Sequence, residues 1–209
     1  KVFEDLTSDL RKGLICPVLL GSAQNGNGIL RLLKALRHEV PFVEETARRL
    51  KVENASSVAY VFKTMQTTHG GKLSLARVLT GEFADGATVV GASGTEERIA
   101  GVFAVRGEEP VKRSTANAGD TVAFGRLEHI HSGESISADK GGIVQIKGPV
   151  APEPVFGIGL GLKDRKDEVK LTTALAKLME EDPSLRLEMN KDTHQMLLLG
   201  QGEMHLRIA

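Results

Sequence analysis

Two histidines separated by one residue, His129 and His131, have the spacing that two metal ligands on one face of a strand would show. No third His, Cys or placed carboxylate accompanies them closely in the sequence, so we expect solvated residues of a β-rich domain rather than a metal site. Cys16 lies among apolar neighbours in "LICPVLL" and has no base nearby in the chain. We expect it to be a small core residue in a reducing compartment.

The glycine-rich segments do not form a phosphate-binding loop. "GGKL" at 70–73 has a leucine where G-x-x-x-x-G-K-[ST] needs the magnesium-binding hydroxyl, and it lacks the earlier glycine. We therefore expect a hairpin turn there. "DKGG" at 139–142 fits D-x-x-G, but a pattern with two fixed positions often arises by chance in a glycine-rich connection. The catalytic inventory does not predict a self-contained enzyme.

The remaining candidate is "GSA", Gly21 to Ala23, between an expected strand at 17–20 and an expected helix at 28–40. Small residues at such a turn let backbone N–H groups approach a flat ligand closely, and a purine carbonyl oxygen is a suitable acceptor. A tight turn before a helix explains the same residues equally well. The pattern alone leaves both interpretations open.

The elements around this turn need a sheet that the sequence does not supply. Residues 28–40 have helical spacing, with Asn27 placed to cap the helix and Pro41 placed to end it. Its apolar face consists of Ile29, Leu32, Leu33 and Leu36. A helix of this length is marginal alone and has to dock on other elements. One strand and one helix do not make a core.

The rest of the chain predicts two further folded units. Residues 57–147 contain short β-branched and aromatic runs between glycine turns, which favours a closed β-barrel or a sandwich. Pro149, Pro152 and Pro154 form a stiff, extended connector. After it come a strand, a helix from about 166 to 181, two short strands and the start of another helix. That order is typical of a ferredoxin-like, split βαβ unit without its last strand.

The charges and the apolar runs restrict the partners and the location. The 27 basic and 27 acidic residues balance, so no basic surface for binding nucleic acid by counterion release is visible. The sequence has neither a signal peptide nor an apolar run of the roughly 20 residues that cross a bilayer. We expect a cytoplasmic protein without a membrane partner. Because the chain starts at Lys1 and ends within "GEMHLRIA", we also expect it to be a piece of a longer protein.

Blocks along nearly the whole chain resemble the translational GTPases, most closely elongation factor G. They are "PVLLGSAQNGNGILRLLKAL", "VAYVFKTM", "GKLSLARVLTG", "ERIAGVF", "PVFGIGLGLKDRKDEVKLTTALAKLMEEDPSLRLEMN" and "GQGEMHL". The resemblance implies the end of a GTPase domain at 1–46, a second-domain β-barrel at 47–152 and a truncated ferredoxin-like third domain at 153–209. It also implies that an α/β GTPase domain precedes Lys1.

The same resemblance implies a site and partners. Ser22 and Ala23 would present backbone donors to the guanine O6, an interaction that adenine cannot make because its amino group does not accept. The parent protein would bind GTP with magnesium, act as a GTPase on the ribosome and couple hydrolysis to tRNA–mRNA translocation. The phosphate loop and magnesium ligand would belong to the upstream part. We therefore expect that this chain neither binds nor hydrolyses GTP by itself. We also expect it to be a monomer.

Other interpretations stay open at this point. "KTMQTTHGGKLSLARVL" and "PFVEETARRLKV" differ from the commonest elongation factor G wording, so a paralogue acting in ribosome protection or recycling fits as well. A nucleotide-independent module that binds RNA or protein is a second class, in which "GSA" is only a turn. A hydrolase that uses His129 or His131 is a third class, for which we expect no activity.

Overall fold

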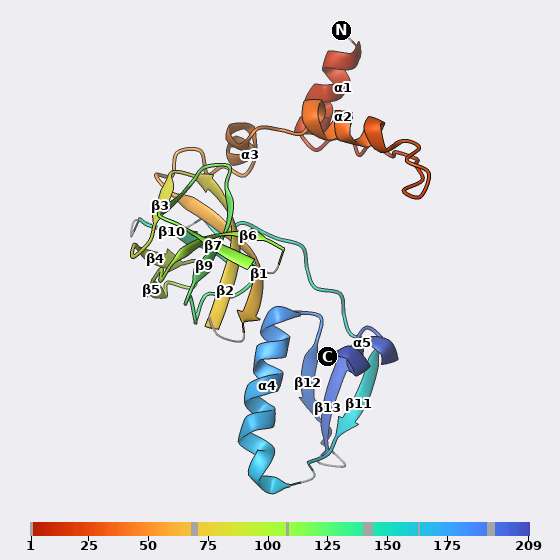
Figure 1. Ribbon diagram of the computed structural model, residues 1–209, viewed down its shortest axis with the longest axis vertical. Coiled ribbons are helices and arrows are strands. Elements are labelled where there is room, and N and C mark those ends of the chain that lie inside the picture. The colour runs from red at the N-terminus through yellow and green to blue at the C-terminus, as the bar shows by residue number, and fades with distance from the viewer. Residues whose placement is uncertain (1, 68–70, 108, 140–143, 163, 192–194) are drawn as a thin grey trace.

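The computed structural model describes the chain apart from residues 1, 68–70, 108, 140–143, 163 and 192–194. A helical N-terminal segment, a β-barrel and a smaller α/β unit follow one another along the long axis (Figure 1). The mainly β architecture and the order of barrel and ferredoxin-like unit agree with the fold class that the sequence predicts.

The N-terminal segment contains three helices, α1 (Val2–Arg11), α2 (Ile29–Glu39) and α3 (Val43–Arg49). The predicted helix at 28–40 is confirmed as α2, whereas the sequence patterns used above do not predict α1 or α3. The predicted cap is wrong. Gly28, with φ of 78°, is the N-cap of α2 and makes no side-chain cap hydrogen bond. Asn27 instead uses its backbone oxygen, which accepts from the Ser22 N–H at 2.9 Å.

The predicted strand at 17–20 is also wrong. This run has no strand structure, and Val18 and Leu20 are 84% and 90% exposed. A strand forms only where a neighbouring strand accepts and donates its backbone hydrogen bonds. No described residue pairs with this run. For the same reason Cys16 is exposed, and its prediction as a core residue is wrong.

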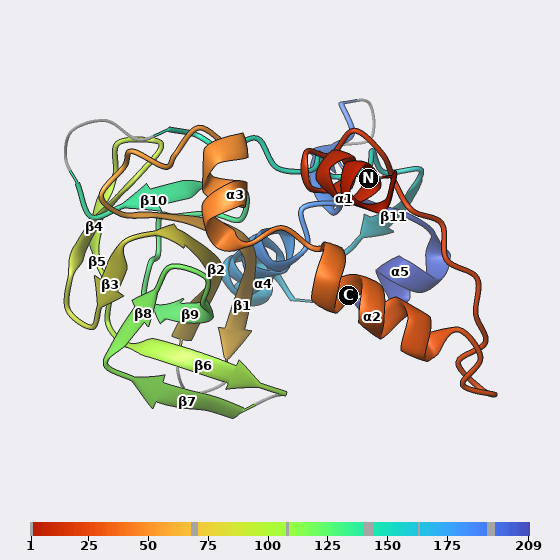
Figure 2. The same ribbon diagram turned by 90° about the horizontal axis from the view of Figure 1, so that it is seen from above.

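Helix α3 joins the N-terminal segment to the barrel. Its Ala47 is buried and packs with Val52, Val58, Leu79 and Ile146. The Glu45 carboxylate accepts from the Phe42 N–H at 3.1 Å, which satisfies a donor at the start of the helix. Seen from above, α3 lies against the barrel while α1 and α2 lie to one side of it (Figure 2). Neither α1 nor α2 has a buried residue.

The barrel consists of a long sheet and a short strand pair. The eight-stranded sheet has the order β5-β4-β10-β1-β2-β9-β6-β7, all antiparallel, and β3 pairs with β8. The strands are β1 (Val58–Thr67), β2 (Gly71–Thr80), β3 (Glu82–Ala84), β4 (Thr88–Gly91), β5 (Glu96–Arg98), β6 (Val102–Arg106), β7 (Glu109–Arg113), β8 (Thr115–Asn117), β9 (Thr121–Gly125) and β10 (Ser135–Ser137).

Two aromatic rings lie at the centre of the barrel core. Phe83 and Phe124 are fully buried, and their ring centroids are 5.5 Å apart in a tilted arrangement. Aliphatic residues from β1, β2, β4, β6 and β9 surround them. At the turn from β2 to β3, Gly81 has φ of 68°, and a Cβ there would lie 2.0 Å from the Ser56 oxygen. Only glycine fits this close approach of two backbones.

The C-terminal unit has the predicted split βαβ order. Its elements are β11 (Phe156–Leu160), a short 3₁₀ turn (Arg165–Asp167), α4 (Glu168–Glu181), β12 (Arg186–Met189), β13 (Met196–Gly200) and α5 (Glu203–Ile208). β13 lies between β11 and β12 and is antiparallel to both, so β11 and β12 run parallel. Leu175, Leu185, Leu198 and Leu206 form the core. Residues 144–155, which include the three connector prolines, contain neither helix nor strand.

Candidate nucleotide-side turn and interdomain contact

The "GSA" residues lie in a compact turn before α2. Ser22 and Asn27 form an isolated antiparallel bridge, and residues 23–26 make the turn between them. The two ends of the turn approach each other so closely that a Cβ on Gly28 would lie 2.5 Å from the Leu20 oxygen. The glycines on either side of the turn are therefore required by the backbone packing.

This geometry leaves one of the two predicted backbone donors free. The Ser22 N–H already donates to the Asn27 oxygen at 2.9 Å. Within the described part of the chain the Ala23 N–H has no acceptor, and Ala23 is exposed. An exposed N–H beside two close-packed glycines can donate to a carbonyl oxygen of a flat base. In the described turn, the Ala23 N–H thus remains available as a donor, while the Ser22 N–H holds the turn closed.

A groove in the N-terminal segment does not include this turn. This groove, of about 700 Å³, lies between α1 and α3, and basic residues such as Arg11, Lys12 and Arg48 line it. The Arg11 guanidinium is held by Glu45 at 3.3 Å, by the His38 oxygen at 3.2 Å and by stacking over the Phe42 ring. These contacts tie α1 and α2 to α3. Two of the groove's charged groups, Arg11 and Glu45, are thus engaged in packing.

The two histidines are not on a strand. His129 and His131 lie in the loop between β9 and β10, which corrects the prediction of alternation on one strand face. His129 is paired with Glu97 at 2.9 Å and His131 with Glu180 at 3.3 Å, and both side chains are mostly exposed. In the described residues no group of three His, Cys, Asp or Glu is arranged to hold a metal ion. Each histidine has its own carboxylate partner instead.

Two other sequence motifs have different outcomes. β1 and β2 form an antiparallel hairpin closed by the pair Thr67 and Gly71, but residues 71–73 of "GGKL" belong to strand β2 and Gly70 lies outside the described residues. Residues 140–142 of "DKGG" lie outside the described residues, while Asp139 accepts a hydrogen bond from the Ser56 hydroxyl.

No described helix is long and apolar enough to cross a membrane.

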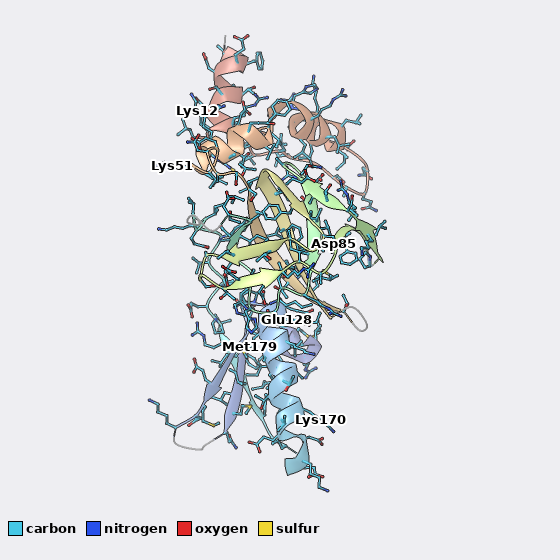
Figure 3. The ribbon with its side chains drawn as sticks, turned by 90° about the vertical axis from the view of Figure 1, so that its left-hand side faces the viewer. Lys12, Lys51, Asp85, Glu128, Lys170 and Met179 are labelled. Carbon is cyan, nitrogen blue, oxygen red and sulfur yellow. The ribbon has the colours of Figure 1, made fainter. Side chains whose placement is uncertain are left out.

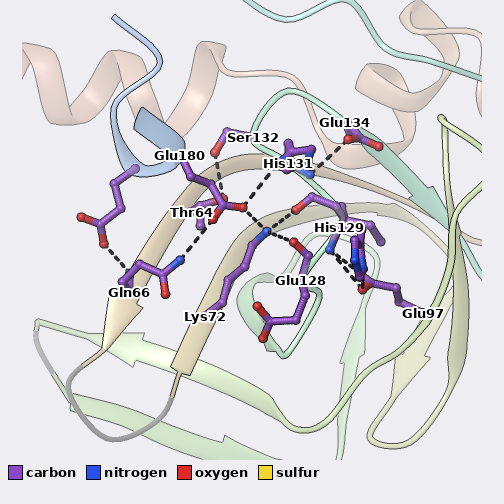
Figure 4. Close-up of polar contacts among 12 residues, drawn as sticks. Thr64, Gln66, Lys72, Glu97, Glu128, His129, His131, Ser132, Glu134 and Glu180 are labelled. Atoms are coloured by element: carbon purple, nitrogen blue, oxygen red, sulfur yellow. Dashed lines mark hydrogen bonds and ion pairs between the residues drawn. The ribbon is translucent and has the colours of Figure 1, made fainter. Parts of the chain in front are cut away.

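The barrel contains a buried lysine that faces the C-terminal unit. The Lys72 side chain is 1% exposed, and its ammonium donates to the Glu128 oxygen at 2.9 Å, to the Ile130 oxygen at 2.8 Å and to the Glu180 carboxylate. A lysine ammonium has three N–H donors. All three therefore have acceptors, two from the β9–β10 loop and one from the end of α4 (Figure 4).

The end of α4 makes further polar contacts with β1. The Gln66 amide donates to the other Glu180 oxygen at 3.1 Å, and the Gln66 backbone N–H donates to the Glu181 carboxylate. Lys63 donates to the Glu181 backbone oxygen at 3.4 Å. In Figure 3, Glu128 on the barrel and Met179 on α4 mark the two sides of this contact. We call the set of Lys72, Gln66, Glu180 and Glu181 the interdomain contact.

Next to this contact, two motifs of the C-terminal unit meet. The His205 Nε2 lies 2.9 Å from the Asp182 carboxylate, and the Gln201 N–H donates to His205 Nδ1 at 3.0 Å. Nδ1 is thus an acceptor, so Nε2 carries the proton that reaches Asp182. Burial works to raise the pKa of Asp182, but hydrogen bonds from Ser184 and His205 outweigh it and hold that pKa below its ordinary value.

The sequence pattern does not predict that Lys72 is buried. Along β2, Lys72, Ser74, Ala76 and Val78 are all buried, although the alternating leucines of "KLSLARVL" favour the opposite face as the inner one. Because side chains two residues apart on a strand point to the same face, this register places Lys72 on the inner face with Ala76 and Val78. A lysine at an inward position requires acceptors. Their identity, on residues 128, 130 and 180, cannot be read from the pattern.

Known proteins match this arrangement over nearly its whole length. Residues 56–139 match the family model "Elongation factor G domain 2" and residues 151–209 match "Elongation Factor G, domain III". An elongation factor G-like protein of Synechocystis sp. is 38% identical over 208 residues, which are 98% of this chain and 30% of that protein. A crystal structure of a Thermus thermophilus protein has a TM-score of 0.77 and 29% identity, covering 97% of this chain and 30% of that one.

The chain thus spans about 30% of the length of these two proteins. Both matched domains coincide with folded units seen here, the barrel with the first and the split βαβ unit with the second. The order of the two units along the chain is the order in which the two family models match. From the match of both domains and of nearly the whole chain, we conclude that the chain belongs to the translational GTPase family and is of the elongation factor G type.

Proposed function

We propose that this chain is part of a ribosome-binding GTPase that couples GTP binding and hydrolysis to movement of tRNA and mRNA. The observation that carries the proposal is the 38% identity over 98% of the chain to an elongation factor G-like protein. The alignment therefore includes the helical segment before the barrel as well as the two matched domains. In a protein of this kind the barrel and the third domain transmit the nucleotide state to the ribosome.

The proposed division of labour follows the three parts of the chain. Residues 1–46 end the GTPase domain, residues 47–152 form the second domain and residues 153–209 belong to the third. The first boundary falls within α3, whose Ala47 packs on the barrel. A movement of the GTPase domain would therefore act on the barrel through this helix. The nucleotide is bound outside these residues, apart from the turn at Ser22 and Ala23.

In this proposal, the chain's own contribution to nucleotide binding is base recognition. The Ala23 N–H donates to the guanine O6, and the Ser22–Asn27 bridge holds the turn that presents it. An adenine presents an amino group at the same place and cannot accept. Bound GTP and magnesium supply the phosphate chemistry from elsewhere in the protein. We therefore propose that residues 1–209 alone do not hydrolyse GTP.

Hydrolysis by the intact protein tests the proposal. We expect GTP hydrolysis that ribosomes stimulate. The triphosphate of 2-aminopurine riboside, which lacks both the O6 acceptor and the N1–H donor of guanine, should bind at least about 10- to 100-fold more weakly than GTP, the effect of losing one or more buried hydrogen bonds. Ala23→Pro removes the donor and should reduce this discrimination, whereas Gln24→Ala should preserve it. An intact protein that binds no GTP would contradict the proposal and favour a nucleotide-independent binding module.

A second function is supported by the name of the Synechocystis relative, an elongation factor G-like protein. A paralogue with this architecture would hydrolyse GTP on the ribosome but act in ribosome protection or recycling. The two functions separate in a single-turnover translocation assay with purified ribosomes. Movement of tRNA and mRNA after addition of the protein and GTP supports translocation. GTP hydrolysis without movement supports the paralogue.

A further inference from the structure

The buried ammonium of Lys72 has an unusual distribution of partners. Two of its acceptors, the Glu128 and Ile130 oxygens, belong to the barrel and stay with Lys72 wherever the third domain lies. The third acceptor, Glu180, lies at the end of α4 in the other domain. The barrel therefore satisfies two of three donors by itself. The last donor needs the third domain or water.

Burial makes the missing partner costly. The Lys72 side chain is 1% exposed and that of Glu180 is 17% exposed, so water reaches neither freely. An ammonium removed from water is stable only when its charge and donors are matched. If α4 moves away, water can reach one side of the ammonium, but Lys72 loses its only anionic partner within the described residues. The docked position of α4 is therefore the one in which the charge of Lys72 is neutralised and all three of its N–H donors have acceptors.

The other groups at the contact align Glu180 rather than replace it. Gln66 donates to one carboxylate oxygen at 3.1 Å, while Lys72 and His131 contact the other, His131 at 3.3 Å. The His131 side chain is 61% exposed, and an exposed pair of this kind contributes little. The Gln66 amide is neutral. Lys72 is thus the dominant cation at Glu180, and Gln66 fixes the orientation of its carboxylate.

We propose that Lys72 is a positioning residue that sets the angle between the barrel and the third domain by an ionic latch to Glu180. The latch has two states: closed, with all three ammonium donors bonded to protein, and open, with one donor exposed to water beside the recess. The family relationship does not by itself indicate which residues hold these two domains together. The contact geometry on β2 and α4 does.

The test measures a barrel-to-α4 distance, which changes with the angle between the domains, in the intact protein with its native cysteines, Cys16 among them, replaced. Spin labels on cysteines introduced at Glu53 and Lys170, both exposed, report the distance between barrel and α4 by pulsed electron resonance. The unmodified contact should give one narrow distance distribution. Glu180→Gln should add a longer distance and lower the ratio of docked to undocked molecules by about tenfold or more. Glu188→Gln, an exposed carboxylate on β12, is the matched control and should change nothing.

A double-mutant cycle separates the latch from a general loss of structure. Lys72→Met should release α4 to a similar extent, and Lys72→Met with Glu180→Gln should release it no further than the more severe single change, because each single change already breaks the pair. Circular dichroism and thermal unfolding verify that the barrel remains folded. Unchanged distances in Glu180→Gln, or additive effects in the double variant, would overturn the proposal. Neither nucleotide nor ribosome is needed, so this outcome is independent of the GTP test.

Discussion

The third domain brings two stretches of its sequence together through single side chains. Asp182, in "EEDP", accepts from the His205 ring, in "GQGEMHL", and from Ser184. The same histidine accepts from the Gln201 N–H, so its two nitrogens connect the end of α4 with the start of α5. These residues form a structural bridge between elements. Packing between these elements explains their place in the sequence pattern.

The lowered pKa of Asp182 gives a prediction for stability against pH. Because the folded-state pKa lies below the ordinary value, the ionised carboxylate stabilises the fold above that value and loses this effect as pH falls through the folded pKa. Asp182→Asn should therefore show a smaller fall in the free energy of unfolding below about pH 4. Urea unfolding at several pH values measures it. Glu153→Gln, an exposed carboxylate, should keep the original slope, and an identical slope for both variants would refute the prediction.

At the candidate site, the hydrogen-bond partners of single residues could not be predicted from the sequence. The pattern indicates Ser22 and Ala23 as a small-residue turn, but the loss of the Ser22 donor to Asn27 depends on the turn closing on itself. The glycines beside Lys72 suggest a turn, and the leucines that alternate with it favour an outward Lys72, whereas the structure buries it. Its partner Glu180 lies in another domain, and no local pattern indicates a contact so distant in the chain.

At the level of elements, long regular segments are predictable and short ones are not. The runs that form β1 and β2 are ten residues long and rich in β-branched and apolar residues, and the run of α4 has a helical period, so their type follows from the sequence. Strands such as β3, β8 and β10 have three residues, too few to show a period. The run at 17–20 has the composition of a strand but no neighbour to pair with among the described residues. The composition of a run favours a strand, but the strand forms only where a partner strand is available.

The barrel core provides a matched test of buried against exposed aromatic residues. Phe83→Ala removes a fully buried ring that contacts Phe124, and it should cost about 3–5 kcal/mol of unfolding free energy through the lost burial and the cavity left behind. Phe62→Ala changes a ring on β1 that is 45% exposed and should cost much less. Chemical unfolding compares the two. Equal costs would show that Phe83 is not a central core residue.

At the scale of the whole molecule, two connections control how the parts are arranged. One is the polar contact between α4 and the barrel, and the other is the proline-containing connector at 144–155. Proline restricts the backbone and stiffens an extended segment. We expect the connector to limit the range of angles and the contact to select one of them. Such a combination allows a small number of defined arrangements of the two domains.

Replacing the connector prolines tests this. Pro152→Gly with Pro154→Gly should broaden the barrel-to-third-domain distance distribution without lowering the unfolding temperature of either domain, because both side chains lie outside the domain cores. Small-angle scattering of the intact protein, or the spin-label pair described above, measures the breadth. Ala151→Gly is a control within the same segment. An unchanged distribution would mean that the connector does not restrict the angle.

The exposed Cys16 has a practical consequence. It is the one cysteine among these 209 residues, and it lies in the unpaired stretch that leads to the turn at Ser22. A maleimide fluorophore added to this chain would therefore attach at a single place, close to the proposed base-recognition site and away from the barrel core. The emission and anisotropy of the fluorophore would change when the surface next to this stretch is covered. No engineered thiol is needed.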